Sequence, residues 1–350
     1  MINLRSLKDE LRAEGLFERC ELRTWGKFSF FALCIAGFLY AHTILPLWAS
    51  ALLVPVTAWF CACLAMLGHE GSHRAFSTNA FRNQVLFHLA FPVMGGVSAK
   101  YWHSKHDVQH HAYPNVADTD PDILLWPMAS TALEYRRSSK ARQWFQRNFQ
   151  GAAFWPLCFL LVWSMRGSGI AFLYRYARDK GMDKSWWADA GSLAVHALVW
   201  IVLPMTFFGL WGLALYASVW TMVGIALSMV FAPAHIGMPI VRDPDDIIRL
   251  QFETTRNLVL PFGLSFFFIG LEHQIEHHLF PRIPHQNLAR AAEITKAWAE
   301  RNDVVYHQIG YLDGLKDTSR FMGTSWQYEP GEFAQIQPQE PASIENALSA

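Results

Sequence analysis

The sequence has little charge, and that charge is unevenly distributed. Asp, Glu, Lys and Arg make up 17% of the 350 residues, whereas soluble proteins average about 25%. None of the four occurs from Phe28 to His69 or from Ala190 to Val241. Each tract is about twice the roughly 20 residues that a helix needs to cross a bilayer. We therefore predict two helical hairpins, with spans over residues 28–45, 48–67, 190–207 and 211–230.

The charge-free tracts also predict a topology. Every Lys and Arg lies outside them, and Pro46 and Gly209 stand where the hairpins would turn. The excess of positive charge on cytoplasmic segments then puts both termini and the large polar segments in the cytoplasm. The net charge of zero gives no basic surface for nucleic acid, so we expect no nucleic-acid partner.

Histidine is the abundant chemical group, with 15 residues in the chain, and eight of them lie in three clusters. Positions i and i+4 share a helix face, so each cluster is predicted to aim one such pair at a single point. Neutral imidazole binds several transition metals, and the spacing does not name one. Eight imidazoles exceed the four ligands of a zinc ion, so two metals with open positions fit better. The clusters are His69 and His73; His106, His110 and His111; and His273, His277 and His278.

Residues beside the clusters leave alternatives open. Gln274 lies within one helix face of His277 and His278, so either His273 or Gln274 opens the third ligand set. Asp107 either hydrogen-bonds the outer nitrogen of a ligand histidine or is a solvated helix residue. His103 is either a surface residue or a group that orients a ligand.

The remaining segments complete an all-α membrane fold with four transmembrane helices, interfacial helices and a histidine-rich cytoplasmic cap. Residues 1–27 form an amphipathic helix on the cytoplasmic face or a solvated helix. The membrane domain covers 28–323, and the Pro-, Gln- and Glu-rich residues 324–350 are expected to be disordered. Three apolar stretches are too short to span, and we expect re-entrant or interfacial positions for the first two. These stretches are 85–97, 154–165 and 258–271.

Two further segments carry specific expectations. The basic segment from Arg166 to Lys184 can lie on anionic lipid headgroups. Residues 287–301 are predicted to form an amphipathic helix with Asn287 as its N-cap.

The three histidine clusters resemble the boxes of the membrane fatty acid desaturase family, of the acyl-lipid, front-end or linoleoyl-CoA group. The matching stretches are GHEGSHRAFS at 68–77, KHDVQHHAYPN at 105–115 and GLEHQIEHHLFPRIP at 270–284. The resemblance implies a dinuclear iron site held by the eight box histidines, with O2 as oxidant and a long acyl chain as substrate. Family members also use a histidine after the last span, and His235 stands there.

The resemblance leaves the reaction open among related oxidations. A hydroxylase, ketolase or acetylenase would use the same boxes. A non-enzymatic metal-binding membrane protein would place charged residues along an ion path inside the spans, and these spans contain almost none.

The sequence also lacks the parts of a built-in electron supply. It has no His-Pro-Gly-Gly motif of a fused b-type cytochrome, and no Gly-x-Gly-x-x-Gly or iron–sulfur cysteine spacing. Neither end offers the roughly 100 residues of such a domain. We therefore expect a separate donor, a ferredoxin or a free b-type cytochrome, that docks near Lys100, Lys105, Arg282 and Arg290.

Overall fold

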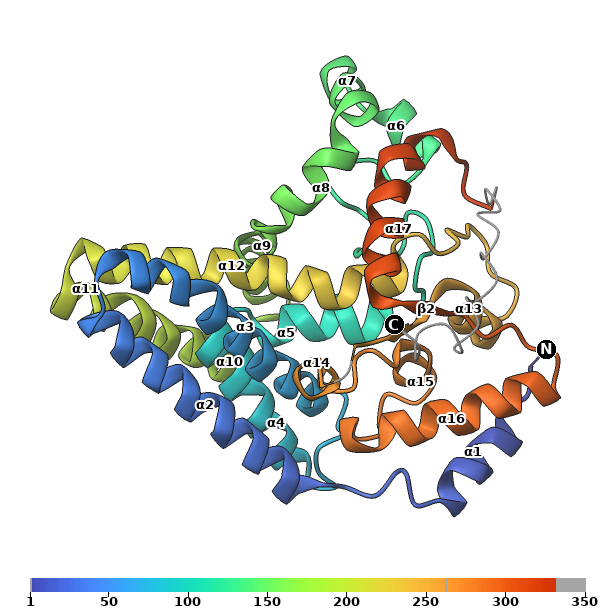
Figure 1. Cartoon of the computed structure of the whole chain (residues 1–350), viewed down its shortest axis with the longest axis horizontal. Helices are drawn as coiled ribbons and strands as arrows, with labels where there is room; N and C mark the ends of the chain where they lie inside the picture. The colour runs from blue at the N-terminus through green and yellow to red at the C-terminus, as the bar shows by residue number, and fades with distance from the viewer. Residues whose placement is uncertain (1, 262, 332–350) are drawn as a thin grey trace, which may run out of the picture.

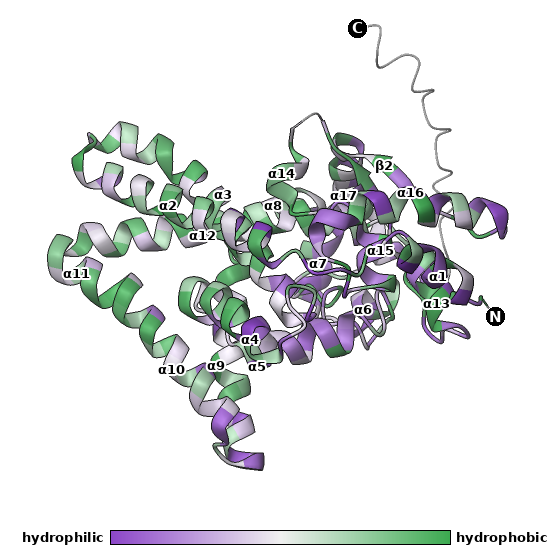
Figure 2. Ribbon diagram, turned by 90° about the horizontal axis from the view of Figure 1, so that it is seen from below, coloured by the Kyte–Doolittle hydropathy of each residue, from purple (hydrophilic) through white to green (hydrophobic). Residues whose placement is uncertain are grey.

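Four long apolar helices form one end of the molecule, and a polar cap forms the other (Figures 1 and 2). The computed structural model describes residues 2–261 and 263–331. By length and composition the four helices can cross a membrane, which confirms the predicted spans. They are α2 (Glu21–Ile44), α3 (Leu47–Ser72), the run of α10 (Lys184–His196), η3 (Ala197–Val202) and α11 (Leu203–Phe208), and α12 (Leu210–His235).

The hairpin turns fall at the predicted residues. Pro46 is the residue before α3, and Gly209 joins α11 to α12 with φ of +59°, which a residue without Cβ adopts freely. The first span begins at Glu21, so the expected boundary at residue 27 falls inside α2. A buried apolar cluster holds α2, α3 and α12 together, with Phe31, Leu67 and Trp220 among its members.

The segment between the first two histidine clusters packs inside the protein. Gly68 and Gly71 on α3 allow this close approach, because a Cβ on Gly71 would lie 2.6 Å from the carbonyl oxygen of Asn83. The first short apolar stretch thus packs against α3. The elements here are α4 (Ala80–His88), the π-helix η1 (Leu89–Gly95), α5 (Ala99–Trp102) and the π-helix η2 (His103–His110).

The middle of the chain contains a sharply bent helix pair. The axes of α8 and α9 differ by 70°, and together the two helices are long and apolar enough to cross a membrane. The expectation that Arg166 lies on lipid headgroups is wrong, because its guanidinium is buried and donates to the carbonyl oxygen of Gly95. The helices are α6 (Ala132–Arg137), α7 (Lys140–Asn148), α8 (Gln150–Cys158) and α9 (Leu161–Lys180).

The cap is built from short elements around the third histidine cluster. Strands β1 and β2 pair in parallel, with Asn257 opposite Gln308. The helices surround them at the right of Figure 1. The elements are α13 (Ile247–Thr254), β1 (Asn257–Val259), α14 (Ser265–Phe268), α15 (Gln274–Leu279), α16 (His285–Arg301), β2 (Gln308–Gly310), α17 (Tyr311–Thr324) and η4 (Ser325–Gln327).

Both ends of the described chain differ from expectation. Helix α1 (Arg5–Ala13) buries Leu7 and Leu11 in one cluster with α16, so its apolar face contacts protein and neither lipid nor water. Helix α16 is amphipathic as predicted, but it starts at His285 after Pro284, so Asn287 is not its N-cap. The expected tail boundary at 324 falls in packed structure, since Ser325 is buried and Gly331 N donates to Ile240 O. Residues 332–350 lie outside the described residues.

Candidate metal centre

Five buried imidazoles meet where α3, η2 and α15 end. Their Nε2 atoms approach one another at hydrogen-bond distance: His69 to His106 is 2.7 Å, and His69 to His73 is 3.1 Å. His111 lies 3.2 Å from His106 and 3.1 Å from His277 by the same atoms. One nitrogen from each ring lies within 4.8 Å of the others. We call these five residues the first group.

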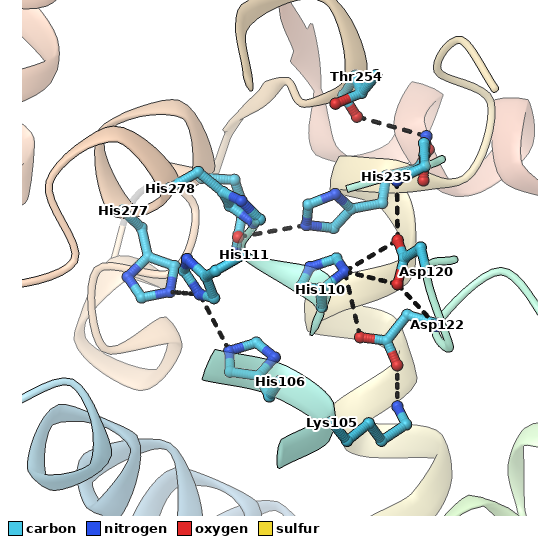
Figure 3. Close-up of polar contacts among 12 residues, drawn as sticks. Lys105, His106, His110, His111, Asp120, Asp122, His235, Thr254, His277 and His278 are labelled. Carbon is cyan, nitrogen blue, oxygen red and sulfur yellow. Dashed lines mark hydrogen bonds and ion pairs between the residues drawn. The ribbon is translucent and has the colours of Figure 1, made fainter. Parts of the chain in front are cut away.

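Three more buried imidazoles form a second group beside the first. His110, His235 and His278 have ring centroids 4.8, 5.0 and 4.9 Å apart in pairs, which makes a nearly equilateral triangle. His111 of the first group stacks on His278 of the second at 4.3 Å, so the two groups are adjacent (Figure 3). His235 therefore comes to the site from the end of α12, next to the second and third clusters.

Of the predicted i and i+4 pairs, only His69 and His73 lie in the same one of these two groups. His106 joins His111, five residues away, because η2 has π-helical bonding and His111 N donates to His106 O. His110 stacks against His106 at 5.3 Å but belongs to the second group. His106, His110 and Asp122 also form an overlapping set of potential ligands.

The arrangement fits bound metal. Metal–nitrogen bonds of about 2.1 Å at a right angle place donor nitrogens about 3 Å apart, and the Nε2 separations of the first group match this. Among the eight grouped histidines, three buried ring nitrogens have no hydrogen-bond partner: His111 Nδ1, His235 Nδ1 and His278 Nε2. The last two belong to the second group, whose lone pairs are thus available to a metal.

Burial and neighbouring imidazoles keep four of the grouped histidines neutral. Burial lowers the pKa values of His106, His111, His277 and His278 well below the ordinary value, and their neighbouring imidazoles lower them further. A neutral imidazole keeps a lone pair for a metal, so these side chains are ready to bind cations.

Two residues that hold the ligand rings were not identified from the sequence. The buried Asp120 carboxylate accepts from His110 Nδ1 at 3.0 and 3.1 Å, which directs Nε2 toward the second group. Gln251 Oε1 accepts from His278 Nδ1 at 3.0 Å. Asp120 lies ten residues after His110 and Gln251 lies on α13, so the spacing within the histidine clusters pointed to neither residue.

The structure separates the alternatives at the third cluster. His273 precedes α15, is only partly buried and lies 3.8 Å from Glu272, so it joins neither group. Gln274 is buried, and its Oε1 lies 3.4 Å from His235 Nε2. The physical reason is the start of α15 at Gln274: with φ of −102° and ψ of 63°, His273 lies outside the helix.

Asp107 and His103 form a link from the second cluster to the surface. His103 is exposed and donates from Nδ1 to Asp107 at 2.7 Å. The other carboxylate oxygen of Asp107 lies 3.5 Å from His73 Nε2 and accepts from Ser72 at 3.3 Å. Asp107 is therefore a partner of the first group, and His103 contacts that group only through it.

Comparison with known proteins identifies the family. The fatty acid desaturase profile matches residues 43–310, which include all eight grouped histidines. The chain is 26% identical to an acyl-lipid (9-3)-desaturase of Physcomitrium patens over 88% of this chain and 61% of that protein. It is 29% identical to the Delta(5) fatty acid desaturase fat-4 of Caenorhabditis elegans, covering 88% of this chain and 70% of that protein. It is 28% identical to fatty acid desaturase 3 of Bos taurus, covering 84% of this chain and 66% of that protein.

The chain thus spans about two thirds of the length of these relatives. The profile covers most of the 350 residues, and it includes both apolar hairpins and the site that they hold. The four candidate spans agree with a membrane location. This membrane protein therefore belongs to the fatty acid desaturase family.

Proposed function

We propose that the chain is an O2-dependent desaturase that introduces a double bond into a fatty acyl chain at a di-iron centre. The proposal rests on one observation: eight buried histidines form two adjacent groups inside the region that the family profile matches. The first group would hold one iron. The second group would hold the other, with Gln274 beside it as a further oxygen donor or a water-bearing contact.

The metal and the protein side chains would have separate roles in this reaction. Bound iron would supply the reductive activation of O2. The activated oxygen would then remove one hydrogen from each of two neighbouring methylenes. The protein holds the imidazole rings in place through Asp120, Gln251 and Asp107. It excludes water with the apolar ends of α3 and α12, which pack against each other beside the rings.

The substrate is proposed to be an acyl chain carried by lipid or CoA, because relatives are named for acyl-lipid and Delta(5) fatty acid desaturation. Within the desaturase family, we propose that the enzyme is of the front-end type. We expect the histidine groups and both termini to face the cytoplasm, since the charge-free hairpins leave the basic residues on that side.

The electron donor is proposed to be a separate protein, a ferredoxin or a b-type cytochrome, because the sequence has no His-Pro-Gly-Gly motif. The basic residues first expected to receive it are largely engaged. Lys105 pairs with Asp122 beside the site, and Arg290 pairs with Glu14 and Glu293. Lys100 lies over the ring of Tyr176. Arg282 is exposed and is the best remaining candidate of the four.

The test is gas chromatography of fatty acids from cells that express the chain, with the His278→Ala variant as the inactive control. We expect a new unsaturated acid with the wild type only. A hydroxylated or keto acid would instead support the related oxidations, and unchanged lipids with intact two-metal protein would argue against acyl chemistry.

Purified protein given substrate, O2 and NADPH should stay inactive until a reductase and carrier are added.

A further inference from the structure

The third span contains a buried carboxylate that contacts neither lipid nor the metal groups. Asp189 lies on α10, and it is fully buried although α10 belongs to the span with the smallest share of buried residues. A carboxylate at such a position is costly unless polar groups satisfy it. Its partners therefore indicate what the residue does.

All the partners of Asp189 lie at the start of one helix. Its Oδ2 accepts from Ser98 Oγ at 2.7 Å and from Lys100 N at 3.0 Å, and its Oδ1 accepts from Ala99 N at 3.0 Å. Ser98 Oγ in turn accepts from Tyr101 N at 3.1 Å. Asp189 thus satisfies the free amides at the N-terminus of α5 and places negative charge at the positive end of its dipole.

The capped helix is the one that carries the second histidine cluster. Helix α5 passes directly into η2, since Trp102 and His103 at the junction both have right-handed helical backbone angles. The register set at Ser98 therefore determines where His106, His110 and His111 lie. These three imidazoles contribute to both groups, so a rotation of this helix would disturb both.

Two more side chains from the apolar bundle hold the turn before this helix. His196 Nδ1 lies 3.1 Å from Val93 O, and Arg166 donates to Gly95 O from Nε at 3.0 Å and from Nη2 at 2.8 Å. Both side chains also bind the hydroxyl of Tyr216. Gly96 has φ of +65° and no room for a Cβ, which would lie 2.6 Å from the His196 ring.

We propose that Asp189 is a positioning residue for the metal centre: from the third span it caps the helix that carries His106, His110 and His111 and fixes the direction of their imidazoles. The inference rests on the proposed function, because it takes these histidines as metal ligands. Arg166 and His196 assist by holding the preceding turn.

The test is a Co²⁺ titration of the full chain in detergent after removal of metal by a chelator, followed by visible absorption. Asp189→Ala should weaken Co²⁺ binding by about tenfold or more, as loss of a group that orients ligands does in other metal sites. Asp189→Asn keeps the volume and one acceptor oxygen, so its effect should be smaller. If Asp189→Ala does not fold, the Co²⁺ affinity of Asp189→Asn is compared with that of the wild type instead.

The matched control is Ser192→Ala on the same helix. Ser192 Oγ bonds His88 Nδ1 at 3.1 Å and does not contact the capped helix, so Co²⁺ binding should stay within about twofold of wild type. Hydrogen exchange should increase across residues 98–111 in Asp189→Ala but not in this control. Ser98→Ala should also weaken Co²⁺ binding, because it removes one donor to Asp189 and the acceptor for Tyr101 N.

The outcomes separate the two proposals. Wild-type affinity in Asp189→Ala, or an equal loss in Ser192→Ala, would overturn the positioning role while leaving the metal centre in place. A wild-type chain that binds no Co²⁺ would overturn the proposed function and this inference with it.

Discussion

The two His-His doublets each divide their imidazoles between the two groups. His110 lies in the second group and its neighbour His111 in the first, while His277 lies in the first and His278 in the second. Consecutive helical residues point about 100° apart, so a doublet facing the gap between two sites supplies one ligand to each. The number of histidines predicted two metals, but the division between them depends on helix geometry that the sequence spacing does not contain.

The unequal size of the groups makes the first prediction. The second group has three histidines and the first has five, so loss of one ligand should matter more in the second. Purified His278→Ala should contain about one metal per chain, whereas His73→Ala should retain about two. Elemental analysis against protein concentration measures this. Equal metal loss in both variants would contradict the assignment of the two groups.

The second prediction concerns the start of the third cluster. Gln274 faces His235, and His273 lies outside both groups beside Glu272. His273→Ala should therefore keep its metal and most of its product. Gln274→Ala should lower activity by about 10–100-fold, the usual effect of removing a group that contacts a metal site. Product assays on equal amounts of membrane-inserted protein compare the two. A strong loss of product in His273→Ala but not in Gln274→Ala would show that His273 becomes a ligand when metal is bound.

At the scale of elements, the sequence predicted what depends on composition. Long charge-free tracts placed the ends of the four spans to within seven residues, since a bilayer excludes charge over a whole helix length. It did not predict what depends on packing. Arg166 looked like a headgroup contact because charge is usually exposed, yet the Gly95 carbonyl and the Tyr216 hydroxyl satisfy it inside the protein. Helix α1 looked like a membrane-surface helix because its true partner, α16, is almost 300 residues away.

The third prediction tests the contact between α3 and the segment after it. A Cβ on Gly71 would lie 2.6 Å from Asn83 O and 2.9 Å from Phe87 N, and backbone atoms cannot move aside cheaply. Gly71→Ala should thus destabilise the protein by about 1–3 kcal/mol. Gly191→Ala on α10 is the control, because nothing lies within 4 Å of its Cβ and the exchange should stabilise the helix slightly. Thermal unfolding in detergent should rank the control at or above wild type and Gly71→Ala well below it.

At the scale of the whole molecule, the histidine groups determine how often the chain crosses the membrane. His69 lies in the last turn of α3 and His235 ends α12, and rings of the second cluster contact both. The chain between His110 and His235 must therefore cross an even number of times. If the run α10–α11 and helix α12 each cross once, we expect that the bent pair α8–α9 is not a single fifth span. Its 70° bend is consistent with a segment that enters and leaves on one side.

This topology gives a labelling prediction at two exposed residues. Met182 lies between α9 and α10 on the side of the histidine groups, and Leu210 lies at the tip of the second hairpin on the opposite side. In intact cells a membrane-impermeant maleimide should label Leu210→Cys but not Met182→Cys, and permeabilised cells should label both. The parent chain, with its five free cysteines, measures the background. In intact cells, labelling of Met182→Cys with protection of Leu210→Cys would contradict this topology, because it would mean that α8–α9 crosses the bilayer or that the whole chain is inverted. Labelling of both positions would mean that the second hairpin does not span.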